Sequence, residues 1–253
     1  MKIFQAERMK YRHTSMNRIT FLMPFLTVLL AAALTSNFFA VDSYNWWYTG
    51  MYPGYLAVMC SIIGGKDKSK KNYTIWSLPC DMKKIWDAKI FTGMVMSGIS
   101  VSVVVVMTIF IGNVMKMALH VEYIAVPTIF RQLLAGVLMW ITSLWEIPVC
   151  LFLSQKIGKF LTLIIHVGFY IIMSNFLSLK SFFMLFPGTI TARLMCPILG
   201  VLPNGLLMQL GSMTYSPELA GMNNLVIGIP AALIWFGVFW ILSRKWFGRQ
   251  VEV

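Results

Sequence analysis

Charged side chains are scarce in this chain: Asp, Glu, Lys and Arg make up only 12% of its 253 residues. A soluble domain usually carries about 25%, so the scarcity excludes a protein whose whole surface faces water. Apolar residues make up 58% of the sequence. They gather in charge-free runs, and about 20 such residues in a helix cross roughly 30 Å of hydrocarbon. The sequence therefore predicts an all-α polytopic membrane protein.

Signatures of catalysis and of cofactor binding are also missing. The sequence contains no G-x-x-x-x-G-K-S/T loop for ATP and no H-E-x-x-H motif for zinc. Its three histidines are too scattered for a metal site, and its four cysteines lack metal-ligand spacing. The cysteines do not predict a disulfide framework either. We therefore expect no catalytic residue, no metal and no cofactor on this chain.

Basic residues cluster in alternate gaps between the apolar runs. Five lie in the N-terminal tail, seven in residues 66–89, two in residues 156–159 and three near the C-terminus, which accounts for 17 of the 21 lysines and arginines. The remaining four occupy the other gaps: Lys116, Arg131, Lys180 and Arg193. This distribution follows the positive-inside rule and predicts that both termini are cytoplasmic. It favours contact with anionic lipid over binding of nucleic acid.

The apolar runs predict six transmembrane helices within a single domain, residues 1–253. The expected spans are about 20–41, 47–65, 90–113, 131–154, 158–178 and 223–243. The apolar run 194–217 contains three prolines and three glycines, and a crossing there would place the C-terminal arginines outside. We therefore expect a re-entrant hairpin in this run, within an outer loop of residues 180–222.

Two features near the N-terminus concern the membrane surface. Residues 1–18 are basic with scattered apolar side chains, which fits either an interfacial helix or an orienting tail. Between the first two spans, a short gap at residues 42–45 is predicted. The aromatic side chains there are expected to form a belt at the outer interface: Tyr44, Trp46, Trp47 and Tyr48. Gly50, Pro53 and Gly54 predict a kink just after it.

Residues 66–89 carry 10 of the 30 charged side chains in 24 residues, with apolar side chains among the lysines. Pro79 suits a first helical turn, and Asp81 suits the positive end of a helix dipole, so a short helix is predicted over residues 75–90. Its expected contact face consists of Ile75, Trp76, Leu78, Pro79, Met82, Ile85 and Trp86. This face fits a cytoplasmic protein partner and the lipid surface equally well.

Glu146 is the one acidic residue well inside a predicted span, and His166 lies at a similar depth in the next span. Because the two helices are antiparallel neighbours, these side chains could form a hydrogen-bonded pair. Polar residues within membranes are costly and often functional. We interpret the pair as structural, since a proton relay needs more partners.

A series of short motifs resembles the permease subunits of lantibiotic-immunity ABC transporters, the mutacin and epidermin-protection type of the ABC-2 exporter class. The motifs run in order as Ala6-Glu7 with Lys10, Tyr44-Asn45-Trp46-Trp47-Tyr48, Pro53-Gly54, Lys70-Lys71-Asn72-Tyr73, Ser77-Leu78-Pro79, Lys83-Lys84-Ile85-Trp86 and Ala88-Lys89. The match covers residues 1–91, and Glu146-Ile147-Pro148 adds a weaker one.

The resemblance implies six spans, with Glu7 and Lys10 on an N-terminal interfacial helix and a cytoplasmic coupling helix between spans 2 and 3. It implies a complex of two permease chains, often non-identical, with two copies of a separate ATPase that binds ATP and Mg. Such a complex removes a cationic antimicrobial peptide from the cell membrane of a Gram-positive bacterium. The resemblance thus favours protein docking by residues 75–86.

Two other functions stay open on the sequence alone. An intramembrane enzyme would need clustered catalytic groups at one depth, for which only Glu146 and His166 qualify. A membrane sensor or accessory subunit without a transport path would need no special residues.

Overall fold

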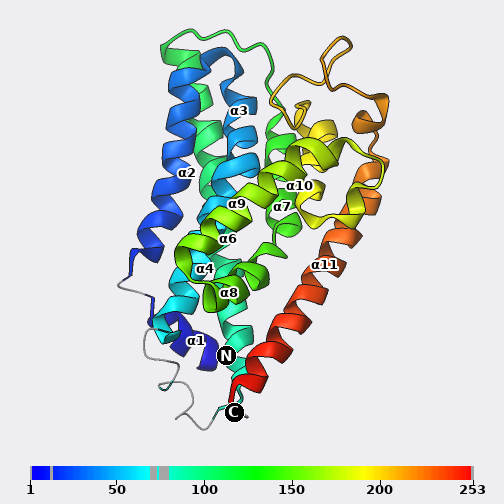
Figure 1. Cartoon of the computed structure of the whole chain (residues 1–253). Coiled ribbons are helices and arrows are strands. Elements are labelled where there is room, and N and C mark those ends of the chain that lie inside the picture. Colours follow the sequence, from blue (N-terminus) through cyan, green and yellow to red (C-terminus); the bar gives the residue numbers. More distant parts are fainter. Residues whose placement is uncertain (1, 12–13, 69–72, 74–79, 252–253) are drawn as a thin grey trace.

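The computed structural model describes residues 2–11, 14–68, 73 and 80–251, and these are almost entirely helical, with no β-strand among them (Figure 1). The expected all-α class is confirmed. The helices are α1 (Lys2–Met9), α2 (Ser15–Leu34), α3 (Phe39–Trp46), α4 (Tyr52–Lys68), α6 (Met82–Ala118), α7 (Ile129–Thr142), α8 (Glu146–Lys156), α9 (Lys159–Phe176), α10 (Pro187–Leu199) and α11 (Asn223–Gly248).

Several of these helices are long and apolar enough to cross a membrane. In the described part of the chain, α2, α6, α11 and α9 with the turn that follows it meet that test singly. The pair α7 and α8, bent by 43° at a short break, meets it together. By length and composition, four helices, or five if the bent pair counts as one span, could therefore cross a membrane.

The first turn between helices lies earlier than expected. Helix α2 ends at Leu34, and a 3-10 turn, Ser36–Phe38, leads into α3, so residues 42–45 are helical and do not form the predicted gap. Their polar groups have partners inside the bundle. The Thr108 hydroxyl donates to Ser43 Oγ at 3.1 Å, and the Tyr44 hydroxyl donates to Gln132 Oε1 at 3.2 Å. Buried polar groups with partners carry little penalty, which is why the helix continues through them.

Helices α3 and α4 are continuous through a π-helical turn, Trp47–Met51. The N–H of Tyr52 bonds the carbonyl of Trp47, five residues back. The next residue, Pro53, has no N–H to donate to the turn. Prolines and π turns are common causes of helix kinks, and the π turn lies where Gly50, Pro53 and Gly54 predict a kink; the kink itself stays a prediction.

Helix α6 is a single helix of 37 residues. It begins at Met82, where Asp81 caps it by accepting a hydrogen bond from the Lys83 N–H at 2.8 Å. The sequence predicted a short helix over residues 75–90 followed by a separate span. No such boundary exists after Met82, because no glycine or proline occurs before Gly93. Residues 75–79 lie outside the described part.

The run 194–217, expected to form a re-entrant hairpin, contains the end of a buried helix followed by an irregular segment, and its re-entrant placement stays a prediction. Helix α10 begins at Pro187, all 13 of its residues are buried, and Gly200 ends it with a φ of 70°. At about 1.5 Å per residue it spans roughly 20 Å, less than a membrane's hydrocarbon core. The Arg193 side chain, buried on α10, donates to the carbonyl oxygens of Ser178 at 3.2 Å and Glu218 at 3.3 Å, which ties the return to the bundle.

Both termini lie at one end of the bundle, near α1 and the start of α6 (Figure 1). The turn between α8 and α9 is close to that end as well, because Gln155 donates to the carbonyl of Gly64 near the end of α4 at 2.6 Å. The connections after α6 and after α10 lie at the opposite end (Figure 1). We call the first of these the basic end, since most lysines and arginines gather there.

Candidate functional site

Five side chains from three separate segments meet at the basic end. Glu7 comes from α1, and Lys10 and Tyr11 from the turn that follows it; Asp67 lies in the last turn of α4, and Lys89 lies in the second turn of α6. Positions three and four residues apart share one face of a helical turn, so residues 7, 10 and 11 point the same way. We call this group the charge cluster.

Lys89 is the centre of the charge cluster. Its side chain has no exposed surface, and its Nζ lies 2.6 Å from Glu7 Oε1 and also contacts Asp67. Lys10 closes the group from the outside, with its Nζ 2.7 Å from Glu7 Oε2 and 3.2 Å from Asp67 Oδ1. The Tyr11 hydroxyl donates to Glu7 Oε1 at 2.5 Å. Two cations thus face two anions, an arrangement that offsets the desolvation cost of burial.

Electrostatic interactions within the charge cluster keep Glu7 and Lys10 charged. Burial disfavours the Glu7 carboxylate, but the charge of Lys89 and the hydrogen bonds from Lys10, Lys89 and Tyr11 outweigh it, so the pKa of Glu7 lies below its ordinary value. Burial also disfavours the Lys10 ammonium, but Glu7 and Asp67 outweigh it and raise the pKa of Lys10. Both groups therefore stay ionised at neutral pH.

The position of the charge cluster gives it a mechanical role. Helices α4 and α6 are the two helices on either side of residues 69–81, and the cluster joins both of them to α1. Paired charges in a buried setting are expensive to separate. A displacement of the start of α6 or the end of α4 would therefore carry α1 with it.

Part of the predicted contact face of residues 75–86 lies outside the described residues, and the rest of it is buried. Ile75, Trp76, Leu78 and Pro79 lie outside the described residues. Met82, Ile85 and Trp86 are buried. The Trp86 ring stacks on Phe247 with centroids 4.5 Å apart, and its Nε1–H donates to Ser243 Oγ at 3.0 Å. In this structure the apolar stripe of the first turns of α6 is thus covered by α11.

The exposed side of the start of α6 is charged. Cys80, Asp81, Lys83 and Lys84 are exposed there. Asp87, further along the same helix, accepts from Trp240 Nε1 at 2.7 Å and from Arg244 Nε at 2.9 Å. Any partner that meets this turn of α6 in the conformation described would meet lysines rather than tryptophans.

Glu146 and His166 are in contact, as their equal depth predicts. His166 Nε2 lies 2.7 Å from Glu146 Oε2, and both side chains are buried. Glu146 is the first residue of α8, directly after the break that follows α7, where the helix dipole favours a carboxylate. The pair joins α8 to α9.

The aromatic residues expected at the outer interface point elsewhere. Tyr44, Trp47 and Tyr48 are fully buried, and Trp46 is half-buried. The rings of Trp47 and Tyr52 stack with centroids 5.2 Å apart. Because α3 and α4 run on as one helix, one face of this aromatic segment packs into the bundle, whereas a belt residue would face lipid.

The resemblance singles out Glu7 and Lys10 and includes Lys89 in a motif, but it predicts neither Asp67 as a site residue nor the pairing of these side chains. Asp67 is a single acid among lysines, and Lys89 directly precedes a charge-free run of 26 residues, 90–115. Each of these was a signal that the side chain is buried and paired. The pairing itself joins residues up to 82 positions apart, which no local pattern reveals.

Metal ligands do not gather anywhere in the part of the chain described here: no group of three or more His, Cys, Asp or Glu could hold an ion. The charge cluster at the basic end consists of paired charges that connect helices.

Comparison of the chain with family models, with curated proteins and with solved structures found no match.

Proposed function

We propose that this chain is the permease subunit of an ATP-driven exporter of the ABC-2 class. It would remove a lantibiotic or similar cationic antimicrobial peptide from the membrane of a Gram-positive bacterium. One observation carries the proposal. Glu7, Lys10 and Lys89 all belong to the motifs that resemble lantibiotic-immunity permeases, and Lys89, 82 positions after Glu7, meets the other two in the charge cluster.

The proposed topology has six spans with both termini in the cytoplasm. The spans would be α2, the continuous helix from α3 to α4, α6, the bent pair α7 and α8, α9, and α11. Helix α1 would lie along the inner membrane surface, and α10 would be a re-entrant helix on the outer side. The placement of basic residues supports this orientation.

The proposed partners are two copies of a separate ATPase, which bind ATP and Mg, and a second permease chain related to this one. Residues 75–86 would dock the ATPase. Closure of the ATPases would move the ends of α4 and α6, and the charge cluster would pass that movement to α1. The cationic peptide would be taken from the outer leaflet or from its lipid target and expelled.

The test begins with the native bacterium. Deletion of this chain should raise sensitivity to a cationic lantibiotic, and an ATP-hydrolysing subunit should co-purify with the tagged wild-type chain. The variant Trp76→Ala, together with the charge reversals Lys83→Glu and Lys84→Glu, should lose both the ATPase and the resistance. Lys116→Glu, at the opposite end of α6, is the matched control and should keep both. Retention of ATPase and resistance in the loop variants would contradict the docking role.

The buried Glu146–His166 pair is the observation that favours a second candidate, an intramembrane enzyme. Replacing both residues with Gln separates the two functions. If the pair is catalytic, the double replacement should abolish resistance outright. If the pair is structural, the variant should keep resistance while the protein becomes less stable. Resistance that does not depend on any co-purifying ATPase would instead point to a sensor or accessory subunit.

A further inference from the structure

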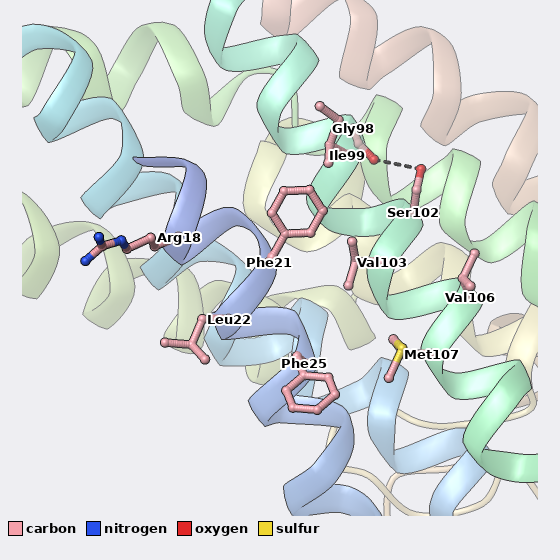
Figure 2. Close-up of a pocket in the computed structure, with 10 residues that line it drawn as sticks. All are labelled: Arg18, Phe21, Leu22, Phe25, Gly98, Ile99, Ser102, Val103, Val106 and Met107. Atoms are coloured by element: carbon pink, nitrogen blue, oxygen red, sulfur yellow. Dashed lines mark hydrogen bonds between the residues drawn. The ribbon is translucent and has the colours of Figure 1, made fainter. Parts of the chain in front are cut away.

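An apolar groove runs between α2 and α6 on the outside of the bundle (Figure 2). Its volume of about 1010 Å³ is at the upper end of the roughly 300–1,000 Å³ typical of ligand sites. Small residues line its α6 wall, Gly98 and Ser102, while Phe21 projects from α2 on the other side (Figure 2).

Measured along the helices, the groove is about as long as one membrane leaflet is thick. Along α2 its lining runs from Arg18 to Phe25, and along α6 from Gly98 to Met107. At about 1.5 Å per residue these stretches measure roughly 10 to 14 Å, close to half of a hydrocarbon core of about 30 Å. Arg18 lies in the first turn of α2, so the groove extends from the half of α2 nearest the basic end to the middle of α6.

One end of the groove is positively charged. Arg18 is exposed, and the ion pairs among the described residues do not include it. Figure 2 shows its guanidinium at the start of α2, pointing away from the apolar wall. Arg8 of α1 is exposed as well and lines an adjacent hollow. Guanidinium groups suit phosphate oxygens in geometry and charge.

We propose that this groove binds an anionic phospholipid of the cytoplasmic leaflet, with an acyl chain against Gly98 and Ser102 and the headgroup phosphate on Arg18. The apolar walls are about as long as one leaflet is thick, and they end at an arginine at the level of the headgroups. The groove therefore matches such a lipid in length and in charge. The proposal depends on the orientation set by the basic residues and not on the transport function, so either can fail without the other.

The test measures lipid retention by the purified full chain in detergent. The two probes are dioleoyl phosphatidylglycerol, which is anionic, and dioleoyl phosphatidylcholine, which has the same chains and no net charge, each counted per protein by native mass spectrometry. Wild-type protein should retain phosphatidylglycerol preferentially. Arg18→Gln should weaken that retention about fivefold, the effect of one basic residue at an anionic surface. Arg131→Gln, an exposed arginine at the opposite end, should have no effect.

A second variant tests the apolar walls. Ser102 is exposed, and its hydroxyl bonds only the Gly98 carbonyl of its own helix, so Ser102→Trp should fold and fill the groove. It should lose both lipids, whereas Val114→Trp, further along α6, should lose neither. Equal retention of the two lipids, or unchanged retention in Arg18→Gln and Ser102→Trp, would overturn the proposal. Efficient disulfide cross-linking of Ser102→Cys between two chains would overturn it too, by showing that protein covers the groove.

Discussion

A lysine side chain without exposed surface is stable only where negative charge surrounds it. Lys89 meets this condition because Glu7 and Asp67 both contact its Nζ. The reverse also holds: the two carboxylates are buried close together and depend on the lysines between them. At the scale of single residues, the charge cluster is therefore the most sensitive point of the molecule.

Replacing Lys89 with Met should destabilise the protein strongly. Removing one partner of a buried ion pair leaves an uncompensated charge and costs about 3–5 kcal/mol. The measurement is denaturant unfolding in detergent, followed by tryptophan fluorescence. The exposed Lys84→Met is the control and should change little. Adding Glu7→Gln to Lys89→Met should restore part of the loss; if it does not, the two side chains are not coupled.

The charge cluster should also make stability depend on pH in the acid range. The pKa of Glu7 is below its ordinary value of 4.5, so its contribution is complete above about pH 4.5 and is lost as the pH falls through the lower, folded-state pKa. Thermal unfolding measured from neutral pH downward should show this decline. Glu7→Gln should be less stable at neutral pH and should decline less steeply in acid. An identical acid slope in both proteins would rule out the contribution of Glu7.

At the scale of helices, Glu146 and His166 hold α8 against α9 directly after the break in the bent pair α7 and α8. A double-mutant cycle with Glu146→Gln and His166→Gln should therefore give a coupling energy within the range of about 0.5–3 kcal/mol found for contacting residues. Unfolding in detergent gives the free energies of unfolding of the wild type, the two single variants and the double variant. Additive effects of the two substitutions would mean that the pair contributes nothing to the contact between α8 and α9.

The contact of α6 with α11 gives a further prediction. Trp86→Ala should cost about 3–5 kcal/mol of stability, as expected for a large buried aromatic side chain, because its ring stacks on Phe247. Trp46→Ala, at a half-buried position, should cost less. If Trp86→Ala abolished ATPase co-purification while leaving stability unchanged, Trp86 would act at the partner interface rather than in the packing seen here.

Charge-free apolar runs were sufficient to predict α9 and α11 to within a few residues, because one run lies between Lys159 and Lys180 and the other between Glu218 and Arg244. Helical periodicity adds which side of a helix is apolar. It was not sufficient for α3, where Ser43, Tyr44 and Asn45 look like a turn until their partners are known. It also missed the start of α6, since Met82, Ile85 and Trp86 form an apolar stripe that suits lipid, a partner or α11. Periodicity shows which side of a helix is apolar, but tertiary packing decides what covers it.

At the scale of the whole molecule, cysteine labelling can test the orientation. Among the described cysteines only Cys80 is exposed, and it lies at the basic end. A membrane-impermeant maleimide should label it after cell permeabilisation but not in intact cells. Met213 lies at the opposite end and is 91% exposed. A cysteine introduced there by Met213→Cys, in a Cys80→Ser background, should be labelled in intact cells. The reverse pattern would invert the topology.

Overall architecture and candidate site differ in how far the sequence predicts them. Charge placement and apolar runs were enough for an all-helical chain whose termini share one end, because both depend on the membrane as solvent. The charge cluster depends on three segments meeting in space. The resemblance points to Glu7, Lys10 and Lys89 separately, whereas Asp67 reads as an ordinary charge of residues 66–89.

The charge cluster pairs two cations with two anions, which determines how it responds to the membrane voltage. A single charge moved across a membrane potential of 100 mV changes energy by about 2.3 kcal/mol. Glu7 and Asp67 cancel Lys10 and Lys89, so the cluster moves as a neutral group and exchanges no energy with the field. A movement passed from α4 and α6 to α1 through this group would have the same energy in a polarised cell as in a depolarised one.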